Sequence, residues 1–167
     1  MSFYRKSNRL DSYDYSKNGA YFITICTKDK QPILWTKINN TDKNVEANND
    51  RQQDNIALSE IGNICEDGIN KISNHYLNTI VDAYVIMPNH IHLIILLQRD
   101  EEKEIHKNPA ISQIIQQLKG YITRQAGCEI WQKSFYDRII RGEKEYKEIA
   151  EYIENNPLKW QLDRFYI

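Results

Sequence analysis

The segment that most constrains this chain is Met87-Pro88-Asn89-His90-Ile91-His92, which places two of its four histidines two residues apart. The flanking runs, residues 84–86 and 93–97, are apolar and typical of buried strands. Alternate side chains of a strand point to the same face, so both imidazoles would project from one face while Ile91 packs on the other. Two histidines held by a rigid sheet can bind one metal ion. The segment therefore predicts a hairpin with a candidate metal site just after its turn.

The rest of the chain alternates between strand and helix patterns. β-branched and aromatic residues predict strands at 20–27, 33–35, 80–87, 90–97 and 130–135. Helical spacing of apolar residues predicts helices at about 59–75, 110–125 and 143–155, with loops at 39–55 and 100–108. Strand 90–97 is apolar on both faces beyond its histidines, so it must be covered on both sides. We therefore expect one domain over residues 1–167, an α+β ferredoxin-like sandwich with a mostly antiparallel sheet and helices packed on it.

Composition limits the class of protein. A chain of 167 residues suffices for one domain with a real core, and its 41% apolar and 27% charged residues are those of a soluble globular protein. No apolar run reaches the roughly 18 residues of a membrane helix, and residues 1–9 lack the apolar segment of a signal peptide. Cys26, Cys65 and Cys128 show neither a pairing pattern nor zinc-type spacing. We expect a cytoplasmic protein without a membrane partner.

The charge is nearly balanced but unevenly distributed. A net charge of −1 is low for a dedicated DNA-binding protein. Acidic residues gather between positions 38 and 66, whereas basic residues gather at the N-terminus and after position 118. This split permits a local positive groove. From the charge alone, however, a solvated helix face is the better interpretation of these basic residues. The basic residues concerned are Arg5, Lys6, Arg9, Lys119, Arg124, Lys133, Arg138, Arg141, Lys144 and Lys147.

The last expected helix carries a tyrosine and an amide on one flank. At 100° per residue its buried face would consist of Tyr146, Ile149, Ala150 and Ile153. Tyr152 and Asn156 are four residues apart, so they lie one above the other at the rim of that face. The tyrosine hydroxyl could there meet a group bound on the sheet. The alternative, and the commoner case for a lone tyrosine, is a side chain that buries its ring and exposes its hydroxyl to water.

Four blocks in a fixed order resemble the REP-associated tyrosine transposases, relatives of the single-tyrosine transposases in the wider HUH endonuclease group. The first block includes Tyr13-Asp14-Tyr15 and Gly19-Ala20-Tyr21-Phe22-Ile23-Thr24-Ile25-Cys26-Thr27, and the second is Val85-Ile86-Met87-Pro88-Asn89-His90-Ile91-His92. The third is Ile130-Trp131-Gln132-Lys133-Ser134-Phe135-Tyr136-Asp137-Arg138-Ile139-Ile140-Arg141, and the fourth is Tyr152-Ile153-Glu154-Asn155-Asn156-Pro157. The blocks run from residue 13 to residue 157, so the resemblance spans most of the chain. The low net charge departs from what we expect of a DNA enzyme.

The resemblance implies an HUH endonuclease fold and a role for each site residue. His90 and His92 would be metal ligands, Asn156 a third, amide-bearing ligand, and Tyr152 the nucleophile. Mixed imidazole and amide ligation leaves positions open for substrate oxygens and suits Mg²⁺ or Mn²⁺. The product would be a 5′-phosphotyrosine and a free 3′ hydroxyl, which can later rejoin strands without ATP. The base that removes the tyrosine proton cannot be identified from the sequence.

The expected partner is single-stranded or hairpin DNA, such as a palindromic repeat, in a nucleoid-associated setting. Bases outside a duplex can stack on aromatic side chains while basic side chains hold the phosphates. Core packing is the alternative role for the aromatic residues. A homodimer, and use of Tyr152 by its own or a second subunit, stay open. The predicted DNA-binding residues are Arg5, Lys6, Arg9, Lys119, Arg124, Trp131, Tyr136, Arg138 and Arg141.

Two other functions stay open at this point. The chain could be a host-adapted DNA-hairpin-binding protein that no longer mobilises DNA, although the presence of His90, His92 and Tyr152 argues against lost chemistry. It could also be a metal-dependent hydrolase of small substrates, in which Tyr152 is incidental. Inverted repeats or short palindromes around the reading frame would favour the DNA function.

Overall fold

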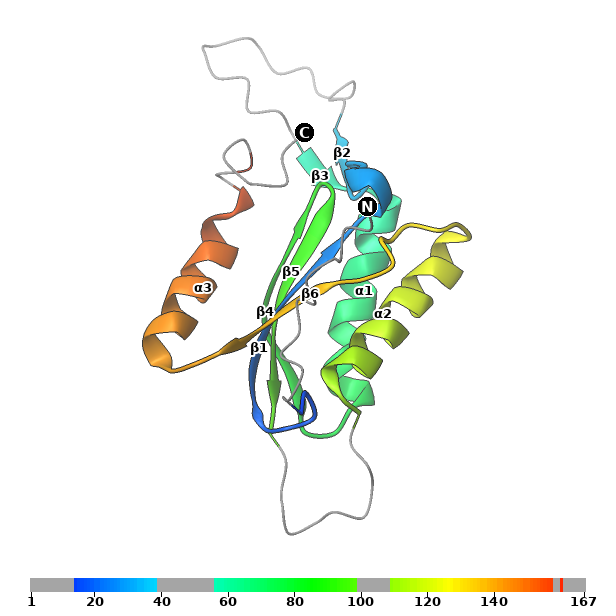
Figure 1. Ribbon diagram of the computed structural model, residues 1–167. Helices are drawn as coiled ribbons and strands as arrows, with labels where there is room; N and C mark the ends of the chain where they lie inside the picture. The colour runs from blue at the N-terminus through cyan, green and yellow to red at the C-terminus, as the bar shows by residue number, and fades with distance from the viewer. Residues whose placement is uncertain (1–13, 39–55, 99–108, 158–159, 161–167) are drawn as a thin grey trace, which may run out of the picture.

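The computed structural model describes residues 14–38, 56–98, 109–157 and 160 (Figure 1). Strands and helices alternate along most of this part of the chain. In order they are β1 (Gly19–Cys26), the 3₁₀ turn η1 (Lys28–Lys30), β2 (Trp35–Lys37), β3 (Ile56–Leu58), α1 (Glu60–His75), β4 (Thr79–Met87), β5 (His90–Leu97), α2 (Ile111–Ala126), β6 (Tyr136–Ile140) and α3 (Glu143–Asn155). None of the described helices has both the length and the apolar character needed to cross a membrane.

The main sheet has the strand order β4-β5-β1-β6, and every neighbouring pair is antiparallel. The units β1-α1-β4 and β5-α2-β6 each join two strands that are separated in the sheet by one strand of the other unit. This interleaving defines the ferredoxin-like fold, so the fold class expected from the sequence is confirmed. Strand β5 lies in the interior of the sheet, and the two-residue turn before it, Pro88-Asn89, matches the expected hairpin.

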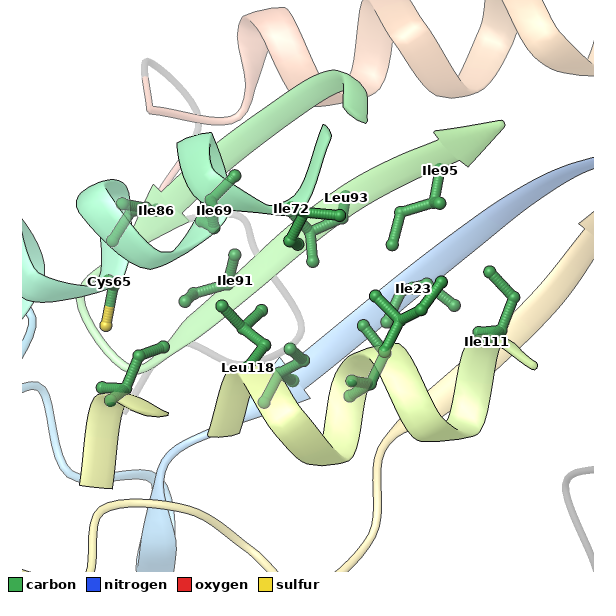
Figure 2. Close-up of a cluster of buried hydrophobic side chains, with 14 of the residues drawn as sticks. Ile23, Cys65, Ile69, Ile72, Ile86, Ile91, Leu93, Ile95, Ile111 and Leu118 are labelled. Atoms are coloured by element: carbon green, nitrogen blue, oxygen red, sulfur yellow. The ribbon is translucent and has the colours of Figure 1, made fainter. Parts of the chain in front are cut away.

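One face of the sheet carries the main apolar core. Helices α1 and α2 pack side by side on this face (Figure 1). Odd-numbered residues of β5, Ile91, Leu93 and Ile95, are fully buried there against α1 and α2. Figure 2 shows these side chains meeting those of the two helices, among them Ile69 and Leu118. Helix α1 begins where the Ser59 hydroxyl accepts a hydrogen bond from the Gly62 backbone N–H, as its sequence predicted.

Among the described helices, α3 is the one that covers the opposite face (Figure 1). Its apolar cluster is smaller, with four buried members: Ile94, Ile140, Ile149 and Ile153. At one end of α3, the Tyr146 hydroxyl donates a hydrogen bond to the Asp82 carboxylate, at the irregularity in the β4–β5 register. Even-numbered residues of β5 point to this face, so β5 is covered on both sides as predicted.

Two strand predictions were wrong in detail. The segment 130–135 is not a strand: Trp131 makes one isolated bridge to Thr27, and regular pairing with β1 begins only at Tyr136. Ile130 is nonetheless buried and Phe135 packs on the main core. The apolar residues of this segment therefore reflect burial of a loop rather than of a strand. The short strand expected at 33–35 is instead Trp35–Lys37, and its partner Ile56–Leu58 was missed because a three-residue ladder leaves no periodic pattern. The predicted loops 39–55 and 100–108 lie outside the described residues.

Candidate functional site

Both histidines of the strand motif lie on the α3 face of the sheet and are buried. His90 is 0% and His92 is 1% exposed, and their ring centroids are 4.5 Å apart with a 68° angle between the planes. They come from successive same-face positions of β5, whose register is set by β1 on one side and β4 on the other. The predicted convergence of the two imidazoles on one face is therefore present in the structure.

His92 has a polar contact on each ring nitrogen. Its Nδ1 is 2.9 Å from the hydroxyl oxygen of Thr24, the residue opposite it on β1. Its Nε2 is 3.2 Å from the hydroxyl oxygen of Tyr152 on α3. The Phe22 ring stacks on the imidazole with centroids 5.1 Å apart and contacts the Tyr152 ring edge-on. These contacts bring the predicted nucleophile within hydrogen-bonding distance of a predicted metal ligand.

His90 is held by the turn that precedes it. Its Nδ1 is 2.8 Å from the side-chain oxygen of Asn89, which is itself fully buried. The Trp160 ring is also close, with its centroid 5.9 Å from that of the His90 ring. Trp160, which follows α3 in the sequence, therefore also borders the site.

Tyr152 is the exposed member of this buried group. Its side chain is 41% exposed, and its ring centroid lies 5.2 Å from that of His92. The ring is fixed against Phe22 and His92 while part of the side chain faces solvent. A phenol placed in this way is accessible to a large substrate and oriented by its neighbours.

Asn156 follows Tyr152 by one helical turn, at the C-terminal cap of α3, and is only 2% exposed. Its amide nitrogen is buried and has no hydrogen-bond partner among the described residues. A buried amide in this state is unusual and would be satisfied by a bound group. Rotation of the terminal amide exchanges nitrogen for oxygen with little change in shape, so the same position can offer an oxygen donor.

A hard divalent cation prefers oxygen ligands, so a site at His90 and His92 would need the amide oxygen of Asn156 as well. No cluster of three or more histidine, cysteine, aspartate or glutamate side chains suited to a metal exists in the described part of the chain. Two imidazoles and one amide oxygen leave several coordination positions for substrate oxygens and water, as Mg²⁺ and Mn²⁺ require. His90, His92 and Asn156 are all buried and supply donor types suited to such an ion, and the metal site they would form remains a prediction.

A groove of about 510 Å³ opens beside Tyr152, between β6 and α3. One straight row across the sheet, formed by Val85, His92, Thr24 and Tyr136, connects the histidine to this groove. Tyr136 is 40% exposed at the groove, and Arg138 is the next same-face residue of β6. The groove is lined by Phe22, Thr24, Tyr136, Asp137, Arg138, Glu148, Ile149 and Tyr152.

Of the predicted DNA-binding residues, Tyr136 and Arg138 lie beside Tyr152. The Arg138 guanidinium forms an ion pair of 2.5 Å with Glu145, although 68% of its side chain is exposed. Arg141 lines a neighbouring hollow of about 580 Å³ together with Arg138 and Lys144. The hollow and the Tyr152 groove share Asp137, Arg138 and Glu148, so their linings carry acidic as well as basic side chains.

Three other predicted residues lie apart from the groove. The Lys119 ammonium donates hydrogen bonds to the backbone oxygens of Gln132 and Lys133, at 2.5 and 3.3 Å, and burial lowers its pKa. Arg124 borders a hollow between α1 and α2, and Trp131 packs against the main core. These positions favour structural roles for Lys119 and Trp131. Arg5, Lys6 and Arg9 lie outside the described residues.

Sequence reasoning missed four residues that border the histidines: Phe22, Thr24, Asn89 and Trp160. Phe22 and Thr24 are brought to the site by the β1–β5 register, which no local pattern encodes. Asn89 could have been found, because a polar residue between proline and a metal-ligand candidate is a natural hydrogen-bond partner for it. Trp160 gave no usable signal because it follows the last helix.

The chain resembles several known proteins. No family model matches it. It is 32% identical to an uncharacterized protein of Haemophilus influenzae, over 98% of this chain and 94% of the relative. It is 30% identical to another H. influenzae protein, assigned to the REP-associated tyrosine transposases, over 95% of this chain and 77% of the relative. Among solved structures, a REP-associated tyrosine transposase bound to a REP hairpin matches 96% of this chain and 74% of its own, with a TM-score of 0.62 and 23% identity.

Proposed function

Because this chain belongs to the REP-associated tyrosine transposase family, we propose that it cuts and rejoins single-stranded or hairpin DNA through a covalent phosphotyrosine on Tyr152. One observation carries the proposal: the Tyr152 hydroxyl oxygen lies 3.2 Å from His92 Nε2, at the rim of a buried histidine pair. The contact unites the two elements that the sequence marked separately, the strand histidines and the helix tyrosine.

The reaction exchanges one phosphodiester for another. The Tyr152 oxygen would attack the phosphorus, forming an O–P bond while the bond from phosphorus to the 3′ oxygen breaks. The phenol loses its proton, and the departing 3′ oxygen takes one up. The DNA then carries a 5′-phosphotyrosine and a free 3′ hydroxyl, and attack by a 3′ hydroxyl reverses the step. One tyrosine limits each site to one covalently held strand at a time.

The chain supplies the orientation for this attack. Contacts with Phe22 and His92 fix the Tyr152 ring, so little rotational freedom is lost when the substrate binds. We propose His90, His92 and Asn156 as the ligands of a Mg²⁺ or Mn²⁺ ion. Such an ion offsets the negative charge of the phosphate and orients it for in-line attack.

The groove between β6 and α3 is our candidate for the DNA path. Tyr136 lies two strands from His92 in the same row, which is about 10 Å at the usual strand spacing. Its half-exposed ring can stack on an unpaired base, and Arg138 and Arg141 can contact phosphates. The hairpin in the structural relative makes hairpin DNA the natural probe. Cytoplasmic, nucleoid-associated location and a homodimer remain predictions.

The test is a covalent-adduct assay. Wild-type protein incubated with labelled hairpin DNA and Mn²⁺ should give a slower band on a denaturing gel. Tyr152→Phe should remove this band but keep DNA binding. The control variants Tyr136→Phe and Tyr146→Phe should still give the band. If Tyr152→Phe still forms the adduct and one of the two control variants does not, the tyrosine replaced in that control is the nucleophile.

Other outcomes separate the alternative functions. DNA that is cut without any tyrosine dependence would indicate a nuclease that activates water. Tight hairpin binding without cutting under any metal condition would indicate a host-adapted binding protein. Cleavage of small phosphodiesters but not DNA would indicate a small-substrate hydrolase.

A further inference from the structure

We propose that Asn89 is a positioning residue that holds His90 in a single neutral tautomer, with the proton on Nδ1 and the lone pair on Nε2. The importance of this tautomer for activity rests on the proposed metal-dependent function. The tautomer itself follows from hydrogen bonds within the chain, and it can be measured without metal or DNA.

The first step is the orientation of the Asn89 amide. Its Nδ2 donates a hydrogen bond of 3.1 Å to the backbone oxygen of Lys30. A carbonyl oxygen can only accept, so the amino group of Asn89 must point toward Lys30 and its Oδ1 must point the other way. Asn89 is 0% exposed, so exchange of the two amide atoms would bury two facing oxygens with no hydrogen between them, which is strongly disfavoured.

The second step passes this orientation to the histidine. Asn89 Oδ1 lies 2.8 Å from His90 Nδ1. The amide oxygen is an acceptor only, so Nδ1 must carry the hydrogen. In a neutral imidazole the other nitrogen, Nε2, is then the lone-pair atom, which is the form that binds a metal.

The third step is the rigidity of the support. Asp29 and Lys30 have φ angles of 54° and 55°, in the left-handed region that few residues other than glycine adopt. The Asn89 backbone oxygen accepts hydrogen bonds from the Thr27 N–H and hydroxyl, at 2.9 and 3.0 Å. The Leu34 N–H donates to the Pro88 oxygen at 2.9 Å. The turn and the 27–34 segment are thus fixed to each other, and the Lys30 carbonyl is held in place.

His92 provides an internal contrast. Its Nδ1 partner is the Thr24 hydroxyl and its Nε2 partner is the Tyr152 hydroxyl. Hydroxyl groups both donate and accept, so these contacts allow either tautomer. The geometry therefore locks His90 and leaves His92 adaptable, although the two rings are adjacent on one strand.

Nitrogen NMR of the metal-free protein tests the proposal. Long-range ¹H–¹⁵N spectra of histidine-labelled protein at about pH 8 distinguish the two neutral tautomers. Wild type should show His90 with the proton on Nδ1, and Asn89→Ala should show loss of this preference. Asn89→Asp keeps an oxygen acceptor for Nδ1 but sets its second oxygen against the Lys30 carbonyl, so it should retain the Nδ1 proton with a weaker preference than wild type. Thr24→Val should alter the His92 signals and leave the His90 tautomer unchanged.

Metal titration gives a second readout. Asn89→Ala should weaken Mn²⁺ binding about 10- to 100-fold in calorimetry, the usual loss for a ligand's hydrogen-bond partner. Asn89→Asp, which keeps the acceptor but loses the bond to Lys30, should recover part of this affinity. A wild-type His90 protonated on Nε2, or an Asn89→Ala variant that keeps the Nδ1 proton, would overturn the proposal. If Asn89→Ala does not fold, the wild-type and Asn89→Asp spectra decide the question. Failure to form a DNA adduct would reject the proposed function and leave this result unaffected.

Discussion

The two faces of the central sheet use the same strands for different purposes. On the α1–α2 face, β5 contributes Ile91, Leu93 and Ile95 to an extensive apolar core. On the α3 face it contributes Ile94 to a four-member buried cluster, and His90 and His92 to a buried polar group. Hydrophobic burial scales with the apolar area removed from water, so the α1–α2 face is expected to supply most of the stability.

The difference teaches how a buried polar site is tolerated. Polar groups removed from water cost free energy unless hydrogen bonds replace the lost contacts. On the α3 face Thr24, Asn89 and Tyr152 provide such contacts for the histidines. The stability supplied by the α1–α2 face allows the α3 face to bury a polar group that hydrophobic packing alone would not favour. Substitutions on the two faces should therefore separate stability from chemistry.

The largest expected effect is on the site face. Tyr152→Phe removes one oxygen and keeps the ring, so adduct formation should fall below detection. The lost hydrogen bond to His92 should change the free energy of unfolding by only about 0.5–1.5 kcal/mol. Gel assays and urea denaturation measure the two quantities. A loss of several kcal/mol in stability would contradict the division of roles between the faces.

Substitutions in the main core should lower the stability of the protein. Ile69→Ala on α1 empties a fully buried position and should cost about 2–5 kcal/mol of unfolding free energy. The matched variant on α3, Ile153→Ala, should cost less, about 2 kcal/mol, because the smaller cluster around it can collapse more easily. Equal costs at the two positions would show that α3 is held as firmly as α1.

Metal should stabilise the protein through the α3 face alone. At a Mn²⁺ concentration 100 times the dissociation constant, binding to the native state adds about 2.7 kcal/mol of stability. His92→Ala should lose this gain in thermal unfolding experiments while remaining folded. Cys65→Ala, on the opposite face, should retain it. Unchanged Mn²⁺ affinity in His92→Ala, measured by calorimetry, would count against the site.

The smallest effect concerns the attachment of α3. The hydrogen bond to Asp82 raises the pKa of the Tyr146 phenol above its usual value of 10.0. A raised folded-state pKa means that the protonated form is favoured in the native state. Its contribution is therefore complete below about pH 10 and is lost as the pH rises through the folded-state pKa.

Tyr146→Phe should lower the unfolding free energy by about 0.5–1.5 kcal/mol near neutral pH and remove this part of the alkaline loss. Urea denaturation from pH 8 to 11 measures both. A Tyr146→Phe variant with wild-type stability at pH 8 would show that the hydrogen bond does not hold α3. Adduct formation should be retained.

Sequence patterns predicted the large elements well, for reasons visible in particular residues. Helical spacing in α2 placed Ile111, Ile114 and Ile115 on the core face, where all three are fully buried. The histidine motif identified β5 and the face on which its imidazoles lie, because strand periodicity requires only the local sequence. Helical periodicity likewise predicted that Tyr152 lies at the rim of the buried face of α3, and its ring contacts His92 while 41% of the residue is exposed.

The prediction failed where distant segments decide the outcome. Residues 130–135 are apolar because they pack on the core from a loop, and their composition cannot be distinguished from that of a strand. Thr24 contacts His92 through a pairing register across 68 positions of sequence, which is set by the whole sheet. The metal site at His90, His92 and Asn156 and the DNA contacts at Arg138 and Arg141 remain predictions, since they depend on a bound group.

The antiparallel register of β5 has a consequence for how this family can vary. Both edges of β5 are paired, from Cys26↔His90 on one side and Met87↔His90 on the other. An insertion or deletion of one residue within the strand would reverse side-chain parity and exchange the imidazoles for core isoleucines. We therefore expect divergence at the site to occur by substitution and natural length changes to fall in the connections between strands and helices.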